Sequence, residues 1–160
     1  MNLPARIAAL VAAAASVVVL NAGAASAANP NNDNDTLASA EACNPPGYSK
    51  FKFTLWYNSG QNGAYRNMHH PIYNFDALRP GDGHDHPLKF CSGGASSPWP
   101  GSLQRVKNNA ASGENFHYKY KARVYFSSGF KGAQDVMGPY QHIDQFRNVY
   151  NDNASFQFTS

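Results

Sequence analysis

Hydrophobic and polar residues alternate along two stretches of the chain, and this pattern predicts β-strands. In the first stretch, one face carries Phe51, Phe53, Leu55 and Tyr57. In the second, Phe116, Tyr118, Tyr120, Ala122 and Val124 alternate with His117, Lys119, Lys121 and Arg123. Successive side chains of a strand point to opposite faces, so each strand is expected to bury one face. The basic stripe of the second stretch could meet an acidic surface, but a solvated strand face is the simpler interpretation.

The two stretches belong to an internal repeat. Residues 55–66, LWYNSGQNGAYR, align without a gap on residues 124–135, VYFSSGFKGAQD. A second pair of similar segments follows, VKNNAAS at residues 106–112 and VYNDNAS at residues 149–155. Each half therefore predicts a strand, a Gly-rich hairpin, a connection, an Asn-rich turn and a final strand. One such motif leaves an open apolar face, which the second copy is expected to cover.

The two copies differ in the length of their connection. Gly63 and Asn108 are 45 positions apart, whereas Gly132 and Asn151 are 19 positions apart. The excess lies within residues 71–105 and is dense in Gly, Pro and Ser, which predicts a long loop. Loops of this length in a compact domain are uncommon unless they are functional or tethered.

The N-terminal residues have the pattern of a secretory signal peptide. Arg6 precedes an apolar run over residues 7–20, and the small residues Ala25, Ser26 and Ala27 form a cleavage site. A retained membrane anchor is disfavoured, because this run is shorter than the roughly 20 residues that cross a bilayer. We therefore expect a secreted, extracellular protein whose signal peptide is residues 1–27.

The composition limits the partners and the fold class expected for the chain after signal-peptide cleavage. Loss of Arg6 lowers the formal net charge from +3 to +2, which is too small to indicate a nucleic-acid partner. Aromatic residues make up 13% of the chain, which favours strands over helices. Residues 28–41, which include the polar segment NPNNDND, are expected to be a disordered leader. Residues 42–160 are expected to form a single all-β domain, monomeric and without a membrane span.

The chain has two cysteines, Cys43 and Cys91. Export exposes them to an oxidising compartment, so an intramolecular disulfide is expected to join the N-terminal arm to the mid-chain loop. Such a bond would stabilise the fold by about 4 kcal/mol on the chain-entropy account. Free thiols or an intermolecular bond are the alternatives.

The hairpins resemble those of a known family. Tyr125, Phe130 and Gly132 have the aromatic and glycine spacing of the βγ-crystallin Greek-key hairpin. The first copy has Trp56 and Gly63 at the matching places but lacks the second aromatic residue. By itself, glycine at these places permits a positive φ or a close approach of an aromatic ring.

The Asn-rich turns NNAAS and NDNAS resemble the turn that follows later in the same motifs, with Ser112 and Ser155 closing each turn. The combined resemblance implies an all-β, βγ-crystallin-like Greek-key β-sandwich built from two repeated motifs, about residues 51–115 and 116–160. Within that superfamily, the chain is most similar to a secreted bacterial peptidase-inhibitor family of the metalloproteinase-inhibitor type.

This narrower resemblance implies an extracellular peptidase as partner and a rigid exposed loop as the contact. The candidate contact residues lie in the long loop: His86, Pro87, Pro98, Trp99 and Pro100. The alternative is a non-inhibitory extracellular module that binds calcium weakly, acts as a killer-toxin-like antimicrobial, or is structural.

The Asn-rich turns also contain the candidate calcium ligands Asn108, Asn109, Asn151 and Asp152. Ca²⁺ takes six to eight oxygen ligands and gains affinity from carboxylates, of which these turns offer one. Asn and Asp also stabilise turns without any ion, because they tolerate the left-handed conformation. We therefore expect either a structural turn or weak calcium binding, with no cofactor required.

The segment GDGHDH places His84 and His86 on one face of an extended stretch near Asp82 and Asp85, and His69 and His70 could add a further metal ligand. Its spacing matches no strong zinc motif, and its glycines favour a solvated loop. Nor does any Ser, His and Asp grouping have the sequence context of a catalytic triad, so no enzyme is expected.

Overall fold

A computed structural model describes residues 29–160, and the predicted signal peptide lies outside the described residues. The helices are α1 (Pro30–Ala38) and the short 3₁₀ helix η1 (Ala40–Ala42). The strands are β1 (Phe53–Asn58), β2 (Asn62–Met68), β3 (Ser112–Asn115), β4 (Lys121–Ser127), β5 (Lys131–Met137), β6 (His142–Ile143) and β7 (Ser155–Thr159). Within this described part, none of the helices is long and apolar enough to span a bilayer.

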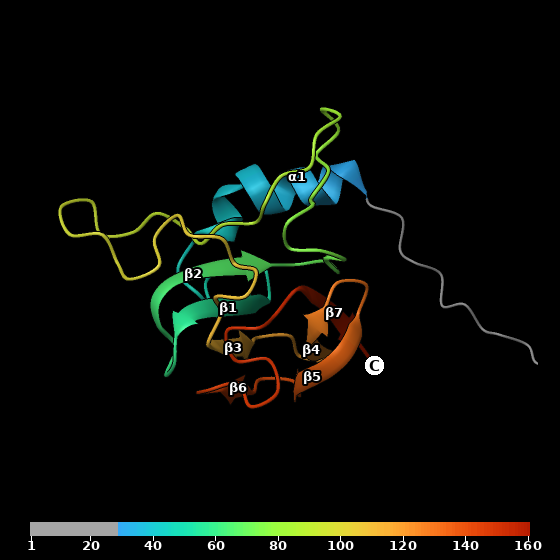
Figure 1. Ribbon diagram of the computed structural model, residues 1–160. Coiled ribbons are helices and arrows are strands. Elements are labelled where there is room, and N and C mark those ends of the chain that lie inside the picture. Colours follow the sequence, from blue (N-terminus) through green and yellow to red (C-terminus); the bar gives the residue numbers. More distant parts are fainter. Residues whose placement is uncertain (1–28) are drawn as a thin grey trace, which may run out of the picture.

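The strands form two antiparallel sheets, ordered β2-β1-β3-β6 and β5-β4-β7, which Figure 1 shows facing each other. The two motifs exchange a segment. Strand β6 follows the second hairpin but pairs with β3 of the first sheet. In return, Ile72 of the first motif forms a bridge with Phe156 of β7. This exchange gives the Greek-key arrangement, and the predicted all-β sandwich of two motifs is confirmed.

Equivalent residues of the two motifs make equivalent contacts. Trp56 pairs with Ser112 across β1 and β3, and Tyr125 pairs with Ser155 across β4 and β7. The amides that precede the two serines, those of Ala111 and of Ala154, each donate to the carbonyl of the paired aromatic residue at 2.9 Å. The repeat in the sequence therefore encodes one strand register used twice.

The core lies between the sheets. The rings of Phe53 and Phe156, from opposite sheets, stack with centroids 4.1 Å apart. Fully buried residues around them include Leu55, Met68, Phe75, Leu88, Phe90, Val106, Val124, Met137, Phe146 and Val149. Burial of a large apolar side chain contributes about 1.5–3 kcal/mol, so this set supplies the main driving force for association of the two motifs. Phe75, Leu88 and Phe90 come from the long connection, which thus contributes to the core.

The second predicted strand begins later than its alternating pattern indicates. Strand β4 starts at Lys121, and the side chain of Tyr118 is 71% exposed. Asn115 explains the delay, because its side chain accepts from the amide of His117 and donates to the carbonyl of Tyr120. These bonds form a turn that competes with strand pairing. The prediction of a strand over residues 116–120 is therefore wrong.

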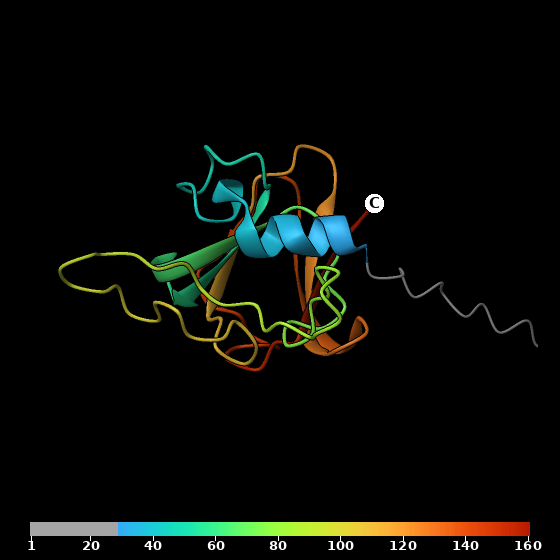
Figure 2. The same ribbon diagram turned by 90° about the horizontal axis from the view of Figure 1, so that it is seen from above.

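The expected disordered leader at residues 28–41 is also wrong for most of its length, because Pro30–Ala38 form α1. Asn29 caps this helix by accepting from the amide of Asn31, and Pro30 occupies its first turn. Figures 1 and 2 show α1 beside the sandwich, on the side of β2. The polar segment is ordered because buried polar contacts, more than apolar burial, connect the helix to the domain.

Candidate functional site

The most prominent feature of the surface is a loop that projects away from both sheets. We call residues 92–100 the projecting loop; Figures 1 and 2 show it extending far from the sandwich. All of residues 95–100 are exposed. The loop begins directly after Cys91, which forms the predicted disulfide with Cys43, with their Cα atoms 5.7 Å apart. The disulfide prediction is confirmed, and the bond fixes the point where the loop leaves the body.

Strand β2 holds both ends of the projecting loop. At the entry, the amide of Cys91 donates to the carbonyl of Tyr65 at 2.9 Å. At the exit, the amide of Ala64 donates to the carbonyl of Pro100 at 2.8 Å. Adjacent residues of one strand thus bind the two ends of the loop, which keeps its base narrow.

The loop is also closed across its own width. The amide of Trp99 donates to the carbonyl of Gly93 at 3.0 Å, and the amide of Ser97 donates to that of Gly94 at 3.0 Å. The indole ring of Trp99 covers Gly93 so closely that a Cβ atom there would overlap it. Glycine is therefore required at position 93 for this packing, and the partly exposed indole of Trp99 supports the loop by packing on its backbone.

The structure separates the predicted contact residues into two groups. Pro98, Trp99 and Pro100 belong to the projecting loop. His86 instead pairs with Leu78 through two backbone hydrogen bonds of 3.0 and 2.8 Å, and Pro87 follows it toward the core. Figure 1 shows this second loop, residues 79–86, pointing in a different direction from the projecting loop. The five residues therefore do not form one contact surface.

The loop at residues 79–86 holds its charged side chains in pairs. The ring of His86 is hydrogen-bonded to Asp82 at 2.7 Å, and Arg79 donates to Asp85 at 2.7 Å. His84 lies in the same exposed loop. Within residues 29–160, no three His, Cys, Asp or Glu side chains come together as a metal-ligand set. The pairs His86–Asp82 and Arg79–Asp85 give these side chains a role in the loop that requires no bound ion.

An aromatic hollow lies between the base of the projecting loop and the first hairpin. It has a volume of about 390 Å³ and is lined by Trp56, Gln61, Asn62, Gly63, Tyr65, Trp99 and Pro100. Ring centroids of Trp56 and Tyr65 are 5.0 Å apart, and those of Tyr65 and Trp99 are 6.0 Å apart. Burial raises the pKa of Tyr65, so its phenol stays neutral and donates to the carbonyl of Cys43 at 3.0 Å.

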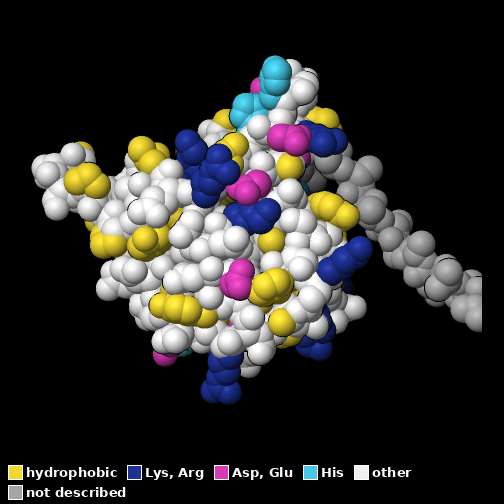
Figure 3. All heavy atoms as spheres, viewed as in Figure 1, with side chains coloured by type: hydrophobic (Ala, Val, Ile, Leu, Met, Phe, Trp, Pro, Cys, Tyr) yellow, Lys and Arg dark blue, Asp and Glu magenta, His cyan; other side chains and the backbone are white. Residues whose placement is uncertain are grey.

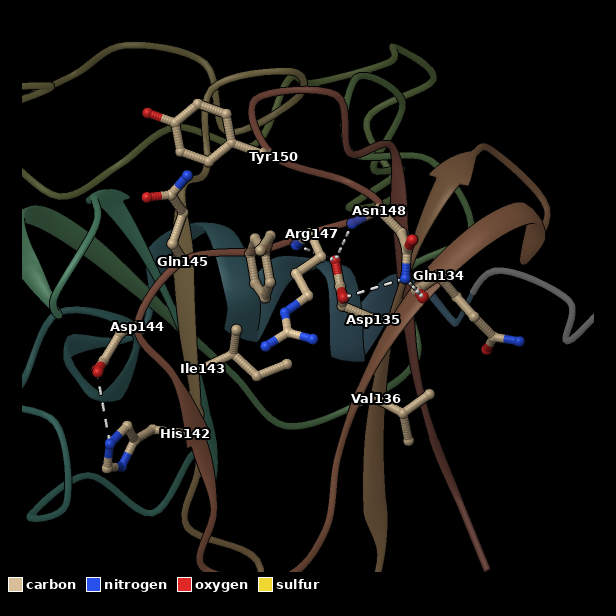
Figure 4. A pocket seen from close by; sticks show the side chains of 11 residues that line it. Gln134, Asp135, Val136, His142, Ile143, Asp144, Gln145, Arg147, Asn148 and Tyr150 are labelled. Carbon is tan, nitrogen blue, oxygen red and sulfur yellow. Dashed lines mark hydrogen bonds and ion pairs between the residues drawn. The ribbon is translucent and has the colours of Figure 1, made fainter.

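A larger open cleft of about 1160 Å³ lies where the edge strands β5 and β6 face each other, and Figure 4 shows its side chains. The carboxylate of Asp135 is buried beside it and accepts from the amides of Arg147, Asn148 and Val149. The guanidinium of Arg147 points into the cleft near Ile143 (Figure 4). Asp135 therefore has a structural role, because it holds the chain segment that forms one wall.

Equivalent residues of the two hairpins have the same backbone conformation, as the repeat in the sequence predicts. Gly63 and Gly132 have φ values of 79° and 80°, and Gln61 and Phe130 have φ values of 51° and 59°. The first hairpin therefore adopts the same backbone as the second without the second aromatic residue. The ring of Phe130 lies 6.0 Å from that of Tyr125.

The Asn-rich turns lie against each other. Asn108 and Asn151 both have positive φ, at 59° and 50°. The amide of Asn108 donates to the carbonyl of Asn153 at 2.9 Å, and the amide of Asn151 donates to that of Ala110 at 3.1 Å. These reciprocal bonds give the turns a structural role at the junction of the motifs.

The other two candidate calcium ligands, Asn109 and Asp152, also engage the backbone nearby. The side-chain amide of Asn109 donates to the carbonyls of Arg105 and Lys107. The amide of Asp152 donates to the carbonyl of Val149. Calcium binding at these turns stays a prediction.

A buried hydroxyl, imidazole and carboxylate lie in a row where α1 meets the domain. Thr36 Oγ1 is 3.2 Å from His70 Nδ1, and His70 Nε2 is 3.2 Å from Asp33 Oδ1. Burial lowers the pKa of His70, although its hydrogen bond to Asp33 opposes this. In the neutral ring, Thr36 donates to Nδ1 and Nε2 donates to the carboxylate, so every polar group is satisfied. Thr36 is fully buried, so a substrate cannot reach its hydroxyl, and the row attaches the helix.

Arg66 completes this attachment at the other end of α1. Its guanidinium donates to the carbonyls of Thr36 and Leu37, which lie in the last turn of the helix. A cation at this end is favourable because the helix carbonyls there lack amide partners. Arg66 is buried, and desolvation lowers its pKa to about 10. These contacts could not be predicted from the sequence, because no local pattern around Arg66 indicates a helix cap 30 positions away.

Comparison with solved structures found two βγ-crystallin domains. One comes from a study of the evolution of the eye lens βγ-crystallin domain fold; it has a TM-score of 0.47 and 14% sequence identity, over 73% of this chain and 90% of the other. The second is a βγ-crystallin domain from Flavobacterium johnsoniae, with a TM-score of 0.43 and 13% identity, over 68% of this chain and 93% of the other. The likeness concerns the fold. No protein-family model matches the chain, and no curated protein sequence matches it.

Proposed function

We propose that this protein is a secreted peptidase inhibitor that presents the projecting loop to its target. The observation that carries the proposal is that the loop projects from the body while both of its ends are fixed to β2. A loop that is ordered before binding loses less conformational entropy on binding than a flexible one does. The disulfide at the entry of the loop and the packing of Trp99 on Gly93 also keep the loop ordered before binding.

The shape and chemistry of the loop suit a concave partner site. Its most distant residues, Ala95, Ser96, Ser97 and Pro98, have small side chains and no charge. Figure 3 shows no acidic or basic side chain on this loop. Peptidases bind their substrates in clefts, and a narrow convex loop can enter such a cleft without burying an unpaired charge.

A shortened loop tests the proposal. Replacement of residues 94–98 by Asn-Gly would join Gly93 to Trp99 through a two-residue turn, closed by the backbone pair that is already 3.0 Å apart. The disulfide and the sandwich are retained in this variant. The matched control is His84→Ala, which changes the other exposed loop.

Inhibition of the target peptidase is expected to disappear in the shortened variant and to persist in the control. Unchanged inhibition by the shortened variant would place the contact elsewhere and contradict the proposal.

A further inference from the structure

The aromatic hollow suggests a second binding activity, separate from the projecting tip. Both tryptophans of the chain, Trp56 and Trp99, line this one hollow. They come from segments 43 positions apart in the sequence, and the hydrogen bond from Ala64 to Pro100 brings the two segments together. We propose that this hollow binds a neutral oligosaccharide.

The walls of the hollow offer apolar ring surface. Trp99 is 45% exposed, and Trp56 is partly exposed beside it. Tyr65 lies between them as a buried floor, with ring centroids 5.0 and 6.0 Å from the two indoles. A pyranose ring with equatorial hydroxyl groups has flat faces of C–H groups, and such faces pack on aromatic rings. The exposed indole of Trp99 is the surface on which one sugar ring would lie.

Side-chain amides at the rim of the hollow offer both a hydrogen-bond donor and a hydrogen-bond acceptor. The side-chain oxygen of Asn62 accepts from the amide of Gly63, which leaves its NH₂ group as a donor. The NH₂ group of Gln61 donates to the carbonyl of Ile143, which leaves its oxygen as an acceptor. Sugar hydroxyl groups both donate and accept, so they match this pair. Convergent polar groups beside an apolar surface are typical of small-molecule sites.

The lining of the hollow offers no ion-pair partner to an anionic ligand. Among the residues that line it, the one ionisable side chain is the phenol of Tyr65, whose pKa is raised by burial. An anionic ligand would lose hydration here without gaining an ion pair. Figure 3 shows hydrophobic side chains, in yellow, near the base of the projecting loop. A neutral polyhydroxylated ligand is therefore the class that the hollow fits.

Intrinsic fluorescence provides a direct test, because both tryptophans line the site. The mature chain, residues 28–160, would be titrated with cellohexaose, laminarihexaose and chitohexaose, and with an acidic galacturonate oligomer for comparison. We expect a saturable change in tryptophan fluorescence with at least one neutral oligomer and none with the acidic one. No change with any neutral oligomer at millimolar concentration would overturn the proposal, as would a preference for the acidic one.

Three variants locate the binding. Trp99→Ala is expected to weaken it at least about tenfold, equivalent to 1.4 kcal/mol. Because this change could loosen the projecting loop, Asn62→Ala is a second variant. It removes an exposed side-chain amide of the rim and its local hydrogen bond to the amide of Gly63, and a several-fold loss is expected from it. Tyr140→Ala removes a 72% exposed aromatic residue elsewhere and is expected to leave binding unchanged. Equal affinity in all three variants would contradict the assignment to this hollow.

Discussion

Ser112 and Ser155 occupy equivalent positions in the two motifs and make the same pair of hydrogen bonds. Ser112 donates to the carbonyl of Asn58 and accepts from the amide of Gln61, while Ser155 does the same with Ser127 and Phe130. Both serines are fully buried. Each one therefore locks the hairpin of its own motif to the last strand of that motif.

We expect Ser112→Ala and Ser155→Ala each to lower the free energy of unfolding by about 1–3 kcal/mol, because each leaves a partly buried backbone donor and acceptor without a partner. Urea denaturation monitored by circular dichroism measures the change in the free energy of unfolding. Ser97→Ala, in the exposed tip, serves as the control and is expected to have no measurable effect. A similarly small effect at Ser112 or Ser155 would contradict the role given to these bonds.

The two hairpin glycines are expected to differ in their tolerance of a side chain. Both have a positive φ near 80°, which costs an L residue about 1–2 kcal/mol. A Cβ atom at Gly63 would also lie 2.9 Å from the carbonyl oxygen of Pro100, whereas at Gly132 the nearest atom would be 3.4 Å away. Gly63→Ala is therefore expected to lower the melting temperature more than Gly132→Ala does, as measured by thermal denaturation.

Gly63→Ala also tests whether the contact with Pro100 holds the projecting loop in place. Displacement of Pro100 by Gly63→Ala would disturb the exit of the loop and the aromatic hollow together. Limited proteolysis is expected to cut the loop faster in this variant than in Gly132→Ala. Equal cleavage rates would show that the contact with Pro100 does not hold the loop.

The disulfide stabilises a connection between residues 48 positions apart. Its removal in the double variant Cys43→Ser and Cys91→Ser is expected to lower the free energy of unfolding by about 4 kcal/mol. Denaturation in urea, with and without reductant, measures the loss. Reductant is expected to reproduce this loss in the wild-type chain and to change nothing in the double variant. Full stability after reduction would contradict this role.

Acid is expected to loosen the attachment of α1 through His70. Burial holds the pKa of His70 below its ordinary value of 6.5, so the unfolded chain takes up the proton first as pH falls. Stability is therefore unaffected by His70 well above pH 6.5 and decreases as the pH falls below that value. Denaturation midpoints between pH 8 and pH 4 would show this slope.

His70→Gln keeps hydrogen-bonding groups at this position but cannot titrate, so the variant is expected to show a weaker pH dependence than the wild type. Some dependence would persist, because burial lowers the pKa of His69 as well. An unchanged slope in the variant would assign the acid sensitivity to other groups.

Most of the sandwich could be predicted from the sequence because its determinants are local and occur twice. The alternation at Phe53 and Leu55 sets a buried face, and the glycines mark both hairpins. The pairing of Cys43 with Cys91 followed from the count of cysteines. These features do not depend on knowing which distant segments meet.

The rest could not be predicted because it depends on contacts between distant segments. Helix α1 has a polar sequence and is attached through His70 and Arg66, whose partners in the helix lie 29 to 37 positions away. The aromatic hollow exists because Pro100 reaches Ala64, and neither Trp56 nor the projecting loop indicates this by itself. Local patterns instead indicate one contact segment that joins His86 and Pro87 to Pro98, Trp99 and Pro100.

The most direct test of the proposed function is a titration of residues 28–160, the chain expected after signal-peptide cleavage, against a panel of secreted metallo- and serine peptidases at fixed enzyme concentration. We expect a stoichiometric loss of activity for at least one peptidase, with the projecting loop uncleaved on mass spectrometry. Full activity of every peptidase at a large excess of the protein, or rapid cleavage of the loop as a substrate, would contradict the proposed function.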